Sequence, residues 1–202
     1  HVYTPLQPLV VSLGLRAGLE GFAFARILSM LAVIGTAILI FVSARRRSGA
    51  IALAVAALYL TVPGVGLWSA VGRPDTLAVF FSACGVVLVD RRWRDQAVLF
   101  AIPFFLLALL AKQNVAMGLV ASCLFLLAKS PPRALFFGAT SLVAGLLLLG
   151  ILQWSSEGWF LFHTVTANAA PYSFAKVIEL QRQFVSDHWP ELVITLFVLA
   201  AW

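Results

Sequence analysis

Residues 71–89 read VGRPDTLAVFFSACGVVLV, and this stretch combines the two features that decide the fold. Its first part, Val71–Asp75, places an arginine, a proline and a carboxylate together. Its second part, Thr76–Val89, is a continuous apolar run. Ionisable groups beside hydrocarbon are costly, and proteins keep them where they serve a purpose. The stretch therefore predicts a membrane helix that begins at a polar site.

The composition of the whole chain is that of a membrane protein. The 202 residues are 62% hydrophobic and 11% charged, and the mean hydropathy is +1.00. Soluble domains carry about 25% charged residues. The apolar runs are long and continuous rather than alternating, which favours helices over a barrel. The expected fold class is all-α, a polytopic transmembrane helical bundle.

The apolar runs predict about six complete spans and a truncated one. They are Phe22–Val42, Ile51–Trp68, Thr76–Val89, Gln96–Ala111, Val115–Leu127 and Ala134–Trp154, with the last beginning at Pro190. Pro5–Leu19 is too short to cross and is expected to be an interfacial or re-entrant helix. Ser173 is expected to cap an amphipathic helix on the outer side. Residues 1–202 are expected to form a single membrane-embedded domain, an internal piece of a longer protein without its first outer loop and its C-terminal part.

The charges of the short connections predict the orientation. If every span crosses once, one side collects Arg45–Arg47, Arg91–Arg94, Lys129 and Arg133. That side has eight basic and two acidic residues, which accounts for the whole formal charge of +6, and the other side is neutral. Basic loops stay in the cytoplasm. We therefore expect a multi-pass protein of the cytoplasmic (inner) membrane, with its polar site on the periplasmic or extracellular side and no nucleic-acid partner.

The candidate site residues come from separate connections that this topology places at one membrane face. They are His1, Tyr3, Arg73, Asp75, Lys112, Gln113, Asn114, His163 and Asn168. Convergence of this kind is what a site between helices needs. It is also the ordinary appearance of any outward face of a membrane protein, so it carries little weight alone.

Two of these residues have both a structural and a functional interpretation. Asp75 is either a favourable acid in a first helical turn, paired with Arg73, or a carboxylate that holds a divalent cation or orients a sugar donor. Lys112 is either a lysine that extends its ammonium to the interface or a cation for a lipid-linked phosphate. The loop residues His163 and Asn168 are either solvated or part of the site.

Several short motifs resemble bacterial membrane glycosyltransferases of the C-type (GT-C) superfamily. They are Tyr3–Leu6, Ala25–Ser29, Arg73–Phe81, Leu110–Asn114 and Gly158–His163 with Asn168. The chain is most similar to the branch that contains protein O-mannosyltransferases and the aminoarabinose transferases of lipid A. The resemblance covers nearly the whole chain, although each motif is short.

The resemblance implies transfer of a hexosyl or pentosyl group from a polyprenyl-phosphate sugar to a glycan, lipid or protein acceptor. It implies that an acid in the first outer loop, upstream of residue 1, acts as the general base, so this piece alone is expected to be inactive. Tyr3 and Pro5 match a segment that binds donor and metal. Asp75 matches an acid that supports the site and in some members ligates a divalent cation, the one cofactor expected. Lys112 matches the lysine that follows the next hairpin in the family and usually stands before Gly or Gln, and here Gln113 follows it.

Two other classes compete with the enzyme. A transporter or flippase of lipid-linked substrates would also carry outward polar residues, but it predicts polar residues at mid-span or paired breaks in two halves. Pro63 and Pro103 lie inside expected spans without matching halves around them. A structural membrane subunit would make the outer polar set incidental.

Overall fold

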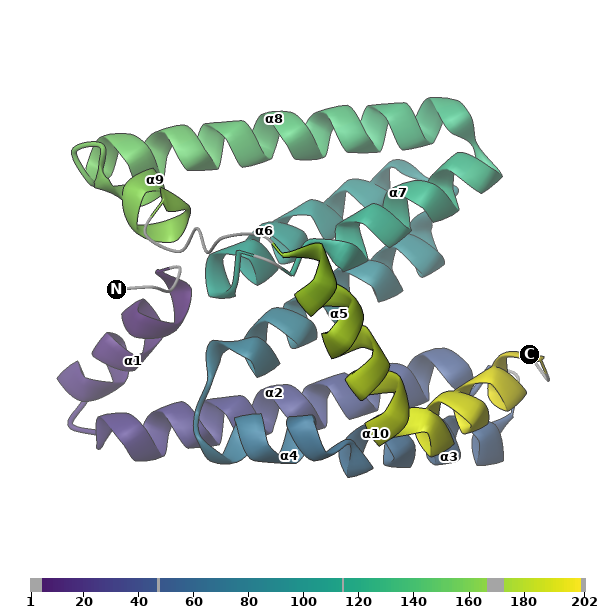
Figure 1. Cartoon of the computed structure of the whole chain (residues 1–202). Coiled ribbons are helices and arrows are strands. Elements are labelled where there is room, and N and C mark those ends of the chain that lie inside the picture. Colours follow the sequence, from purple (N-terminus) through teal and green to yellow (C-terminus); the bar gives the residue numbers. More distant parts are fainter. Residues whose placement is uncertain (1–4, 47, 114, 167–172, 201–202) are drawn as a thin grey trace. The chain divides into compact units, whose positions relative to one another are not determined.

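The computed structural model describes residues 5–46, 48–113, 115–166 and 173–200, and they contain helices and no strand (Figure 1). They divide into two compact units, His1–Ala167 and Asn168–Trp202. In the first unit the elements are α1 Leu6–Arg16, α2 Gly21–Ala44, α3 Gly49–Thr61, α4 Pro63–Ala70, α5 Pro74–Arg92, the 3-10 helix η1 Gln96–Phe100, α6 Ala101–Ala111, α7 Met117–Lys129, α8 Pro131–Ser155 and α9 Trp159–Thr164. The second unit contains α10, Phe174–Ala200. The all-α fold class is confirmed.

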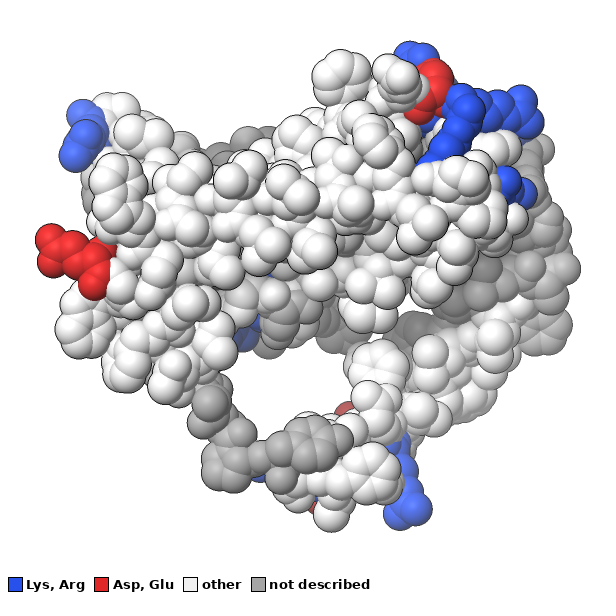
Figure 2. Space-filling model, turned by 90° about the horizontal axis from the view of Figure 1, so that it is seen from above, with Lys and Arg blue, Asp and Glu red and all other residues white. Residues whose placement is uncertain are grey.

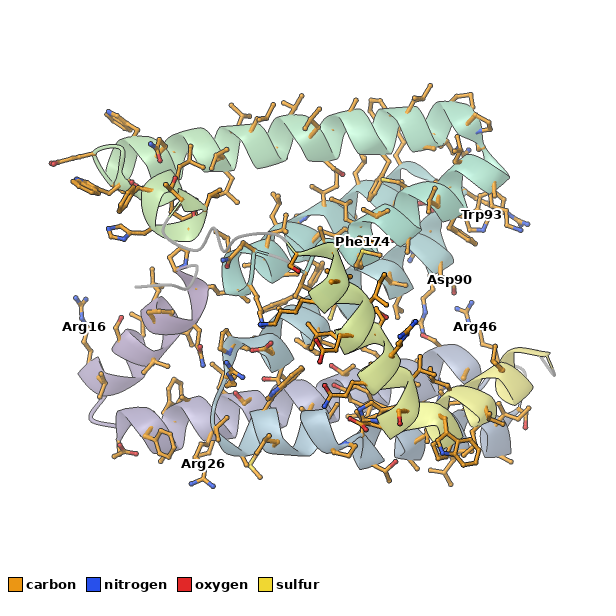
Figure 3. The ribbon with its side chains drawn as sticks, in the orientation of Figure 1. Arg16, Arg26, Arg46, Asp90, Trp93 and Phe174 are labelled. Carbon is orange, nitrogen blue, oxygen red and sulfur yellow. The ribbon has the colours of Figure 1, made fainter. Side chains whose placement is uncertain are left out.

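The long helices of the first unit run up and down between two ends (Figure 1). One end, here called the Asp75 end, holds the α1–α2, α4–α5, α6–α7 and α8–α9 connections. The other, here called the arginine end, holds the α2–α3, α5–η1 and α7–α8 connections. Figure 3 shows Arg16 and Arg26 at the first end and Arg46, Asp90 and Trp93 at the second. The arginine-rich connections therefore share one end (Figure 3), as expected if successive helices alternate in direction.

The number of membrane spans is smaller than expected. Among the described residues, α2 and α8 are long and apolar enough to cross a membrane, and the bent pair α3–α4 makes a third candidate. The η1–α6 segment and α7 are apolar but shorter. The expected count of about six complete spans is therefore not confirmed, although the membrane character of the chain is.

The expected span Ile51–Trp68 is wrong as a single helix. The structure ends α3 at Thr61, and α4 continues at an angle of 58°. Val62 has φ −61° and ψ 119°, the extended conformation that a following proline imposes, and Pro63 then begins α4. One proline thus divides an otherwise continuous apolar run.

The second unit shows a related departure at Pro190. The expected amphipathic helix is present, and the Lys176 N–H donates to Ser173 Oγ at 3.4 Å, as a cap would. The last span is expected to begin at Pro190, but in the structure it continues from the amphipathic helix as part of α10, with a kink at His188, which has the non-helical angles φ −123° and ψ 18°. A proline disturbs the turn before it, since its ring clashes with an upstream carbonyl and it lacks an N–H.

The buried core of the first unit forms two clusters. One lies among α5, η1, α6, α7 and α8, and its buried members are Val89, Val98, Ala101, Ile102, Phe105, Leu126, Ala134 and Phe137. The other is small and lies among α2, α5 and α6, with Ala32, Leu77, Ala78 and Ala111. Leu77 and Ala78 directly follow Asp75 and Thr76 in α5, so this second cluster fixes the first turn of that helix.

Helix α8 is covered by the rest of its unit along only a narrow stripe. Ala134, Phe137 and Ser141 are its buried residues, whereas the side chain of Trp154 is 85% exposed. Its other large apolar side chains that are exposed include Leu135, Phe136, Leu142, Val143, Leu146, Leu147 and Ile151. Figure 2 shows a broad surface of uncharged residues between charged ends. Such a helix fits contact with lipid rather than water.

Candidate functional site

The backbone of the α4–α5 turn depends on Gly72. The Gly72 N–H donates to the Ser69 carbonyl at 3.3 Å, and the Arg73 N–H donates to the Trp68 carbonyl at 3.2 Å. This pair of bonds is the Schellman ending, which places a left-handed residue after the helix. Gly72 has φ +68°, and a Cβ there would lie 3.2 Å from the backbone of Ala25 in α2. Glycine is therefore required both for its conformation and for the close approach of α2.

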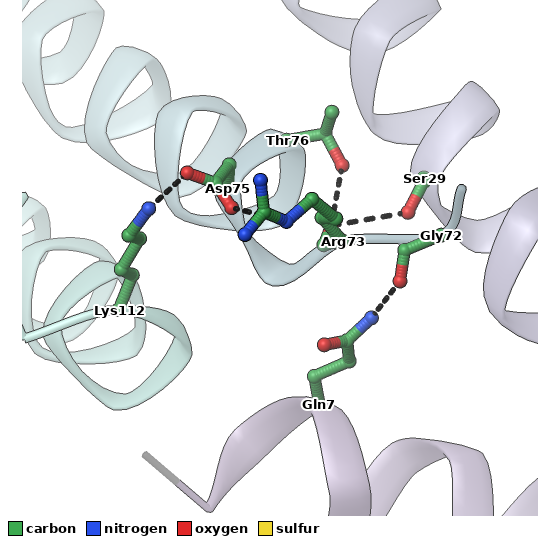
Figure 4. A network of polar contacts seen from close by, with 7 residues as sticks. All are labelled: Gln7, Ser29, Gly72, Arg73, Asp75, Thr76 and Lys112. Atoms are coloured by element: carbon green, nitrogen blue, oxygen red, sulfur yellow. Dashed lines mark hydrogen bonds and ion pairs between the residues drawn. The ribbon is translucent and has the colours of Figure 1, made fainter. Parts of the chain in front are cut away.

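Side chains from three helices hold the next carbonyls of the turn (Figure 4). Gln7 Nε2 of α1 donates to the Gly72 carbonyl. Ser29 Oγ of α2 and Thr76 Oγ1 of α5 both donate to the Arg73 carbonyl, each at 3.2 Å. The turn thus has a fixed position relative to α1 and α2, and Pro74 starts α5 from it.

Asp75 lies in the first turn of α5 and is buried, with 5% of its surface exposed. Lys112, the residue that ends α6, donates from Nζ to Asp75 Oδ1. Arg73 Nε lies 4.0 Å from Asp75 Oδ2, and its side chain is 45% exposed. The ammonium of Lys112 also faces the ring of Trp68, with 5.9 Å to the ring centroid. A buried carboxylate therefore lies between a half-buried ammonium and a more exposed guanidinium.

This arrangement leaves charge and hydrogen-bonding capacity unused. Arg73, Asp75 and Lys112 together carry one net positive charge, so the turn attracts an anion. Asp75 Oδ2 is buried and has no hydrogen-bond partner among the described residues. Buried polar atoms normally find a partner. A ligand that combines an anionic group with a nearby hydroxyl would satisfy both features.

The geometry is compatible with both interpretations of Asp75, but its closest ionic partner is not the one that the sequence suggests. Its first-turn position does complement the helix dipole. Its closer ionic partner, however, is Lys112 from another helix, rather than the neighbouring Arg73. The ammonium of Lys112 accordingly turns inward to the carboxylate. This cross-helix pairing joins two of the predicted site residues.

Two other predicted site residues, Gln113 and His163, lie at or next to α9. Gln113 Nε2 donates to the Thr164 carbonyl at 3.3 Å, which ties α9 to the α6–α7 connection. His163 packs against two rings of α9, with centroid distances of 5.7 Å to Trp159 and 5.4 Å to Phe162. The structure thus brings Gln113 next to α9, while the ring contacts of His163 lie within α9 itself.

Gln153 of α8 fixes the orientation of α9. Its Nε2 donates to the Gly158 carbonyl at 2.6 Å, and its Oε1 accepts from the Leu161 N–H at 2.9 Å. Gly158 has φ +91° and allows the chain to reverse after α8. One side chain therefore braces both the start and the middle of the short helix.

Pro5 precedes α1, and its carbonyl accepts from the Leu9 N–H at 3.0 Å. It lies two residues before Gln7, which contacts the α4–α5 turn. Four other predicted residues, His1, Tyr3, Asn114 and Asn168, lie outside the described residues.

Gln7, Ser29 and Trp68 contact the site, although sequence reasoning did not select them. Ser29 and Gln7 lie in or beside motifs that carry the GT-C resemblance, and that was the available signal. A serine inside an apolar helix and a glutamine between two prolines have no spacing rule that relates them to residue 72. Their roles depend on tertiary contacts.

The donor set around Asp75 does not fit a metal ion held by protein side chains. Within the part of the chain that the structure describes, no three His, Cys, Asp or Glu residues gather as metal ligands. Asp75 itself faces two cationic side chains, which would repel a divalent cation. The metal at Asp75 stays an untested prediction.

Comparison with known families gives one match. The family model described as dolichyl-phosphate-mannose-protein mannosyltransferase matches residues 3–156 of the 202. The matched region contains the α4–α5 turn and Lys112 but ends before α9. No curated protein and no solved structure matches the chain.

Proposed function

Because the chain belongs to the dolichyl-phosphate-mannose-protein mannosyltransferase family, we propose that it is a membrane glycosyltransferase of the GT-C type whose site is built around Asp75 and Lys112. It takes a sugar from a polyprenyl-phosphate donor and passes it to an acceptor at the outer face of the cytoplasmic membrane. The observation that carries this proposal is the buried Asp75–Lys112 pair with Arg73 beside it. The pair lies at the end where the basic and acidic residues of the connections balance.

The reaction breaks the bond between the anomeric carbon and a phosphate oxygen, and the electron pair stays on the departing lipid phosphate. The acceptor oxygen bonds to the same carbon and loses its proton to a base. Lys112 and Arg73 are suited to the growing charge on the phosphate, because fixed cations stabilise a leaving anion. Arg73 can also bind two phosphate oxygens at once.

Asp75 has a different role in this scheme. It holds the ammonium of Lys112 in place through Oδ1, and its free Oδ2 accepts a hydrogen bond from a substrate hydroxyl. The ammonium of Lys112 occupies Asp75 Oδ1, so this oxygen is not available to take the proton of the acceptor. The acceptor is therefore deprotonated by another group, which the GT-C resemblance assigns to an outer loop upstream of residue 1.

Sugar transfer in membranes tests the proposal. The full-length protein is supplied with polyprenyl-phosphate sugars, and Asp75→Asn and Lys112→Gln are compared with wild type. Each variant is expected to lose about 100-fold in rate, the typical effect of removing one charge-stabilising group. Asp90→Asn is the matched control, since it removes an exposed acid from the arginine end of the same helix. Full activity of Asp75→Asn, or no transfer by wild type with any donor, contradicts the proposal.

The transporter alternative has one structural observation in its favour, the break between α3 and α4. Transporters use broken helices to build sites near the middle of the bilayer. Here, however, Asp75 is the one acidic or basic residue that is buried among the described residues, and it lies in the first turn of α5 rather than at mid-helix. Movement of a fluorescent polyprenyl-phosphate sugar across vesicles without acceptor would identify a transporter, and transfer only with acceptor identifies the enzyme.

A further inference from the structure

The arginine end of the first unit carries a dense group of exposed cations. Its described members are Arg45, Arg46, Arg91, Arg92, Arg94, Lys129 and Arg133, and all are exposed. Figure 2 shows Lys and Arg gathered at one end of the molecule, beside the broad uncharged surface. The basic residues of loops orient a membrane protein during insertion, but the structure shows more than their presence in loops.

Two connections that are far apart in sequence are joined here. Arg133 Nη1, at the start of α8, donates to the Trp93 carbonyl after α5 at 2.8 Å. The guanidinium of Arg94 stacks over the ring of Trp93 at 4.9 Å from the centroid. Trp at a membrane interface places its ring at the level of the lipid headgroups. The contacts therefore present cations from both connections at a common level.

The acidic residues at this end neutralise little of the charge. Asp95 Oδ1 accepts from the Ala97 N–H at 2.8 Å and so caps η1, and its Oδ2 lies 3.6 Å from Arg92 Nη1. Asp90 is the other acid of these connections. Most of the basic side chains thus keep donors for an external anion.

The surface next to these cations is apolar. Leu135 and Phe136 follow Arg133 in α8 and are 72% and 60% exposed. Leu127, two residues before Lys129, is also exposed, as is Phe100 at the end of η1. Cations beside exposed hydrocarbon match a molecule with an anionic headgroup and acyl chains, whereas a soluble polyanion would leave the apolar side chains uncovered.

We propose that this surface binds anionic phospholipids of the adjacent leaflet, with phosphate headgroups on Arg91, Arg94, Lys129 and Arg133 and acyl chains along α7 and α8. The chemistry recognised is a phosphodiester at the end of a pair of hydrocarbon chains. This site is separate from the Asp75 end and does not depend on the glycosyltransferase proposal.

Lipid binding to the full-length protein in nanodiscs tests this site. Spin-labelled phosphatidylglycerol and phosphatidylcholine are compared as probes, and the immobilised fraction gives the relative affinity. Wild type is expected to prefer phosphatidylglycerol. Arg91→Gln/Arg94→Gln is expected to lower that preference by about tenfold or more, since each basic residue near an anionic surface contributes about a fivefold factor. Arg16→Gln/Arg26→Gln is the matched control, with two exposed arginines removed from the Asp75 end, and is expected to behave as wild type.

Three outcomes overturn the proposal. Equal binding of the two lipids by wild type would show that the protein has no preference for an anionic headgroup. An equal loss of this preference in the two double variants would show that it depends on the total charge of the protein and not on the surface at the arginine end. Competition by soluble glycerol phosphate as effective as by intact lipid shows that the acyl chains contribute nothing. Folding of each variant is checked by its thermal transition in phosphatidylcholine alone, where the charges have no anionic lipid to bind.

Discussion

The two ends of the first unit handle charge in opposite ways. At the Asp75 end, a single carboxylate is buried and is held between Lys112 and Arg73 on a turn braced by α1 and α2. At the arginine end, many cations are exposed, and among the described residues Arg92 is the one that forms an ion pair with an acidic side chain, Asp95. Position in a membrane protein thus separates two uses of charge. A buried charge needs defined partners and so creates a specific site. Exposed charges act together, through their total number and through the surface on which they lie.

The largest loss of stability is expected when one partner of the buried Asp75–Lys112 pair is removed. Lys112→Met is expected to destabilise the protein by about 3 kcal/mol, because it leaves the buried carboxyl group of Asp75 without its closest cation. Thermal unfolding in detergent micelles measures the loss. Asp75→Asn/Lys112→Met is the control, since neutralising both partners should restore much of the stability. A loss in the double variant as large as in the single one would show that Lys112 contributes by packing alone.

Gly72→Ala tests whether the turn, as well as the charge, is specified. The substitution forces a side chain into a left-handed conformation against the backbone of Ala25, and a cost of about 1–2 kcal/mol is expected. Gly66→Ala in α4 is matched to it, because a Cβ at residue 66 meets nothing within 4 Å and alanine favours a helix. The midpoints of thermal unfolding should fall for residue 72 only. Equal effects at the two positions would contradict the role assigned to the turn.

At the arginine end, a single ionic contact should matter little. Arg92→Gln removes the pair with Asp95, whose side chains are 58% and 52% exposed. Exposed ion pairs contribute about 0.5 kcal/mol or less. The same unfolding measurement applies, ideally at two salt concentrations. A loss above that of Gly72→Ala would mean that this end also contains a specific charge pair.

Glu20 sharpens the comparison, because it lies at the Asp75 end but is exposed. Its carboxylate accepts the N–H groups of Phe22 and Ala23 at the start of α2. These backbone bonds, Ala23 first, lower the pKa of Glu20 below its ordinary value of 4.5. A lowered pKa means that the ionised form stabilises the fold above pH 4.5 and that this contribution disappears as the pH falls through the folded value.

The effect of Glu20 should be the smallest of the four. Unfolding temperatures of wild type and Glu20→Gln are compared at pH 7 and at pH values below 4.5. The difference between the two proteins should shrink in acid. A constant difference at all pH values would show that the carboxylate charge has no part in capping α2.

The sequence predicted where most of the apolar helices lie, because hydrophobic runs and helix-starting prolines are local signals, but it did not predict how many of them are long enough to span a membrane. Pro74 begins α5 directly before Asp75, where a helix start is expected, and Pro131 begins α8 three residues before the expected start at Ala134. Charge alone predicted which end is basic, on the condition that successive helices alternate in direction. Pro63 shows the limit, since a proline inside an apolar run leaves open whether one helix kinks or two helices form, and tertiary contacts decide.

For the site, the sequence indicated the ionisable residues but not their pairing. The Asp75 partner suggested by proximity in the chain is Arg73, and the structure adds Lys112 from the end of another helix. Gln7 was not selected, because amide side chains give no pattern until α1 is placed beside the turn. Pairings across helices depend on packing angles and on the rotation of each helix, which composition and periodicity leave undetermined.

The long, sparsely covered helix α8 has a mechanical consequence. Its 25 residues extend about 37 Å, against a hydrocarbon thickness of about 30 Å. A helix with little protein around it matches such an excess by tilting, so its inclination follows the thickness of the surrounding bilayer. Gln153 connects α9 to the end of α8 by hydrogen bonds, and Gln113, in the α6–α7 connection, hydrogen-bonds to the far end of α9. A change in bilayer thickness therefore exerts a force on the hydrogen bond between Gln113, the residue after Lys112, and Thr164 at the end of α9.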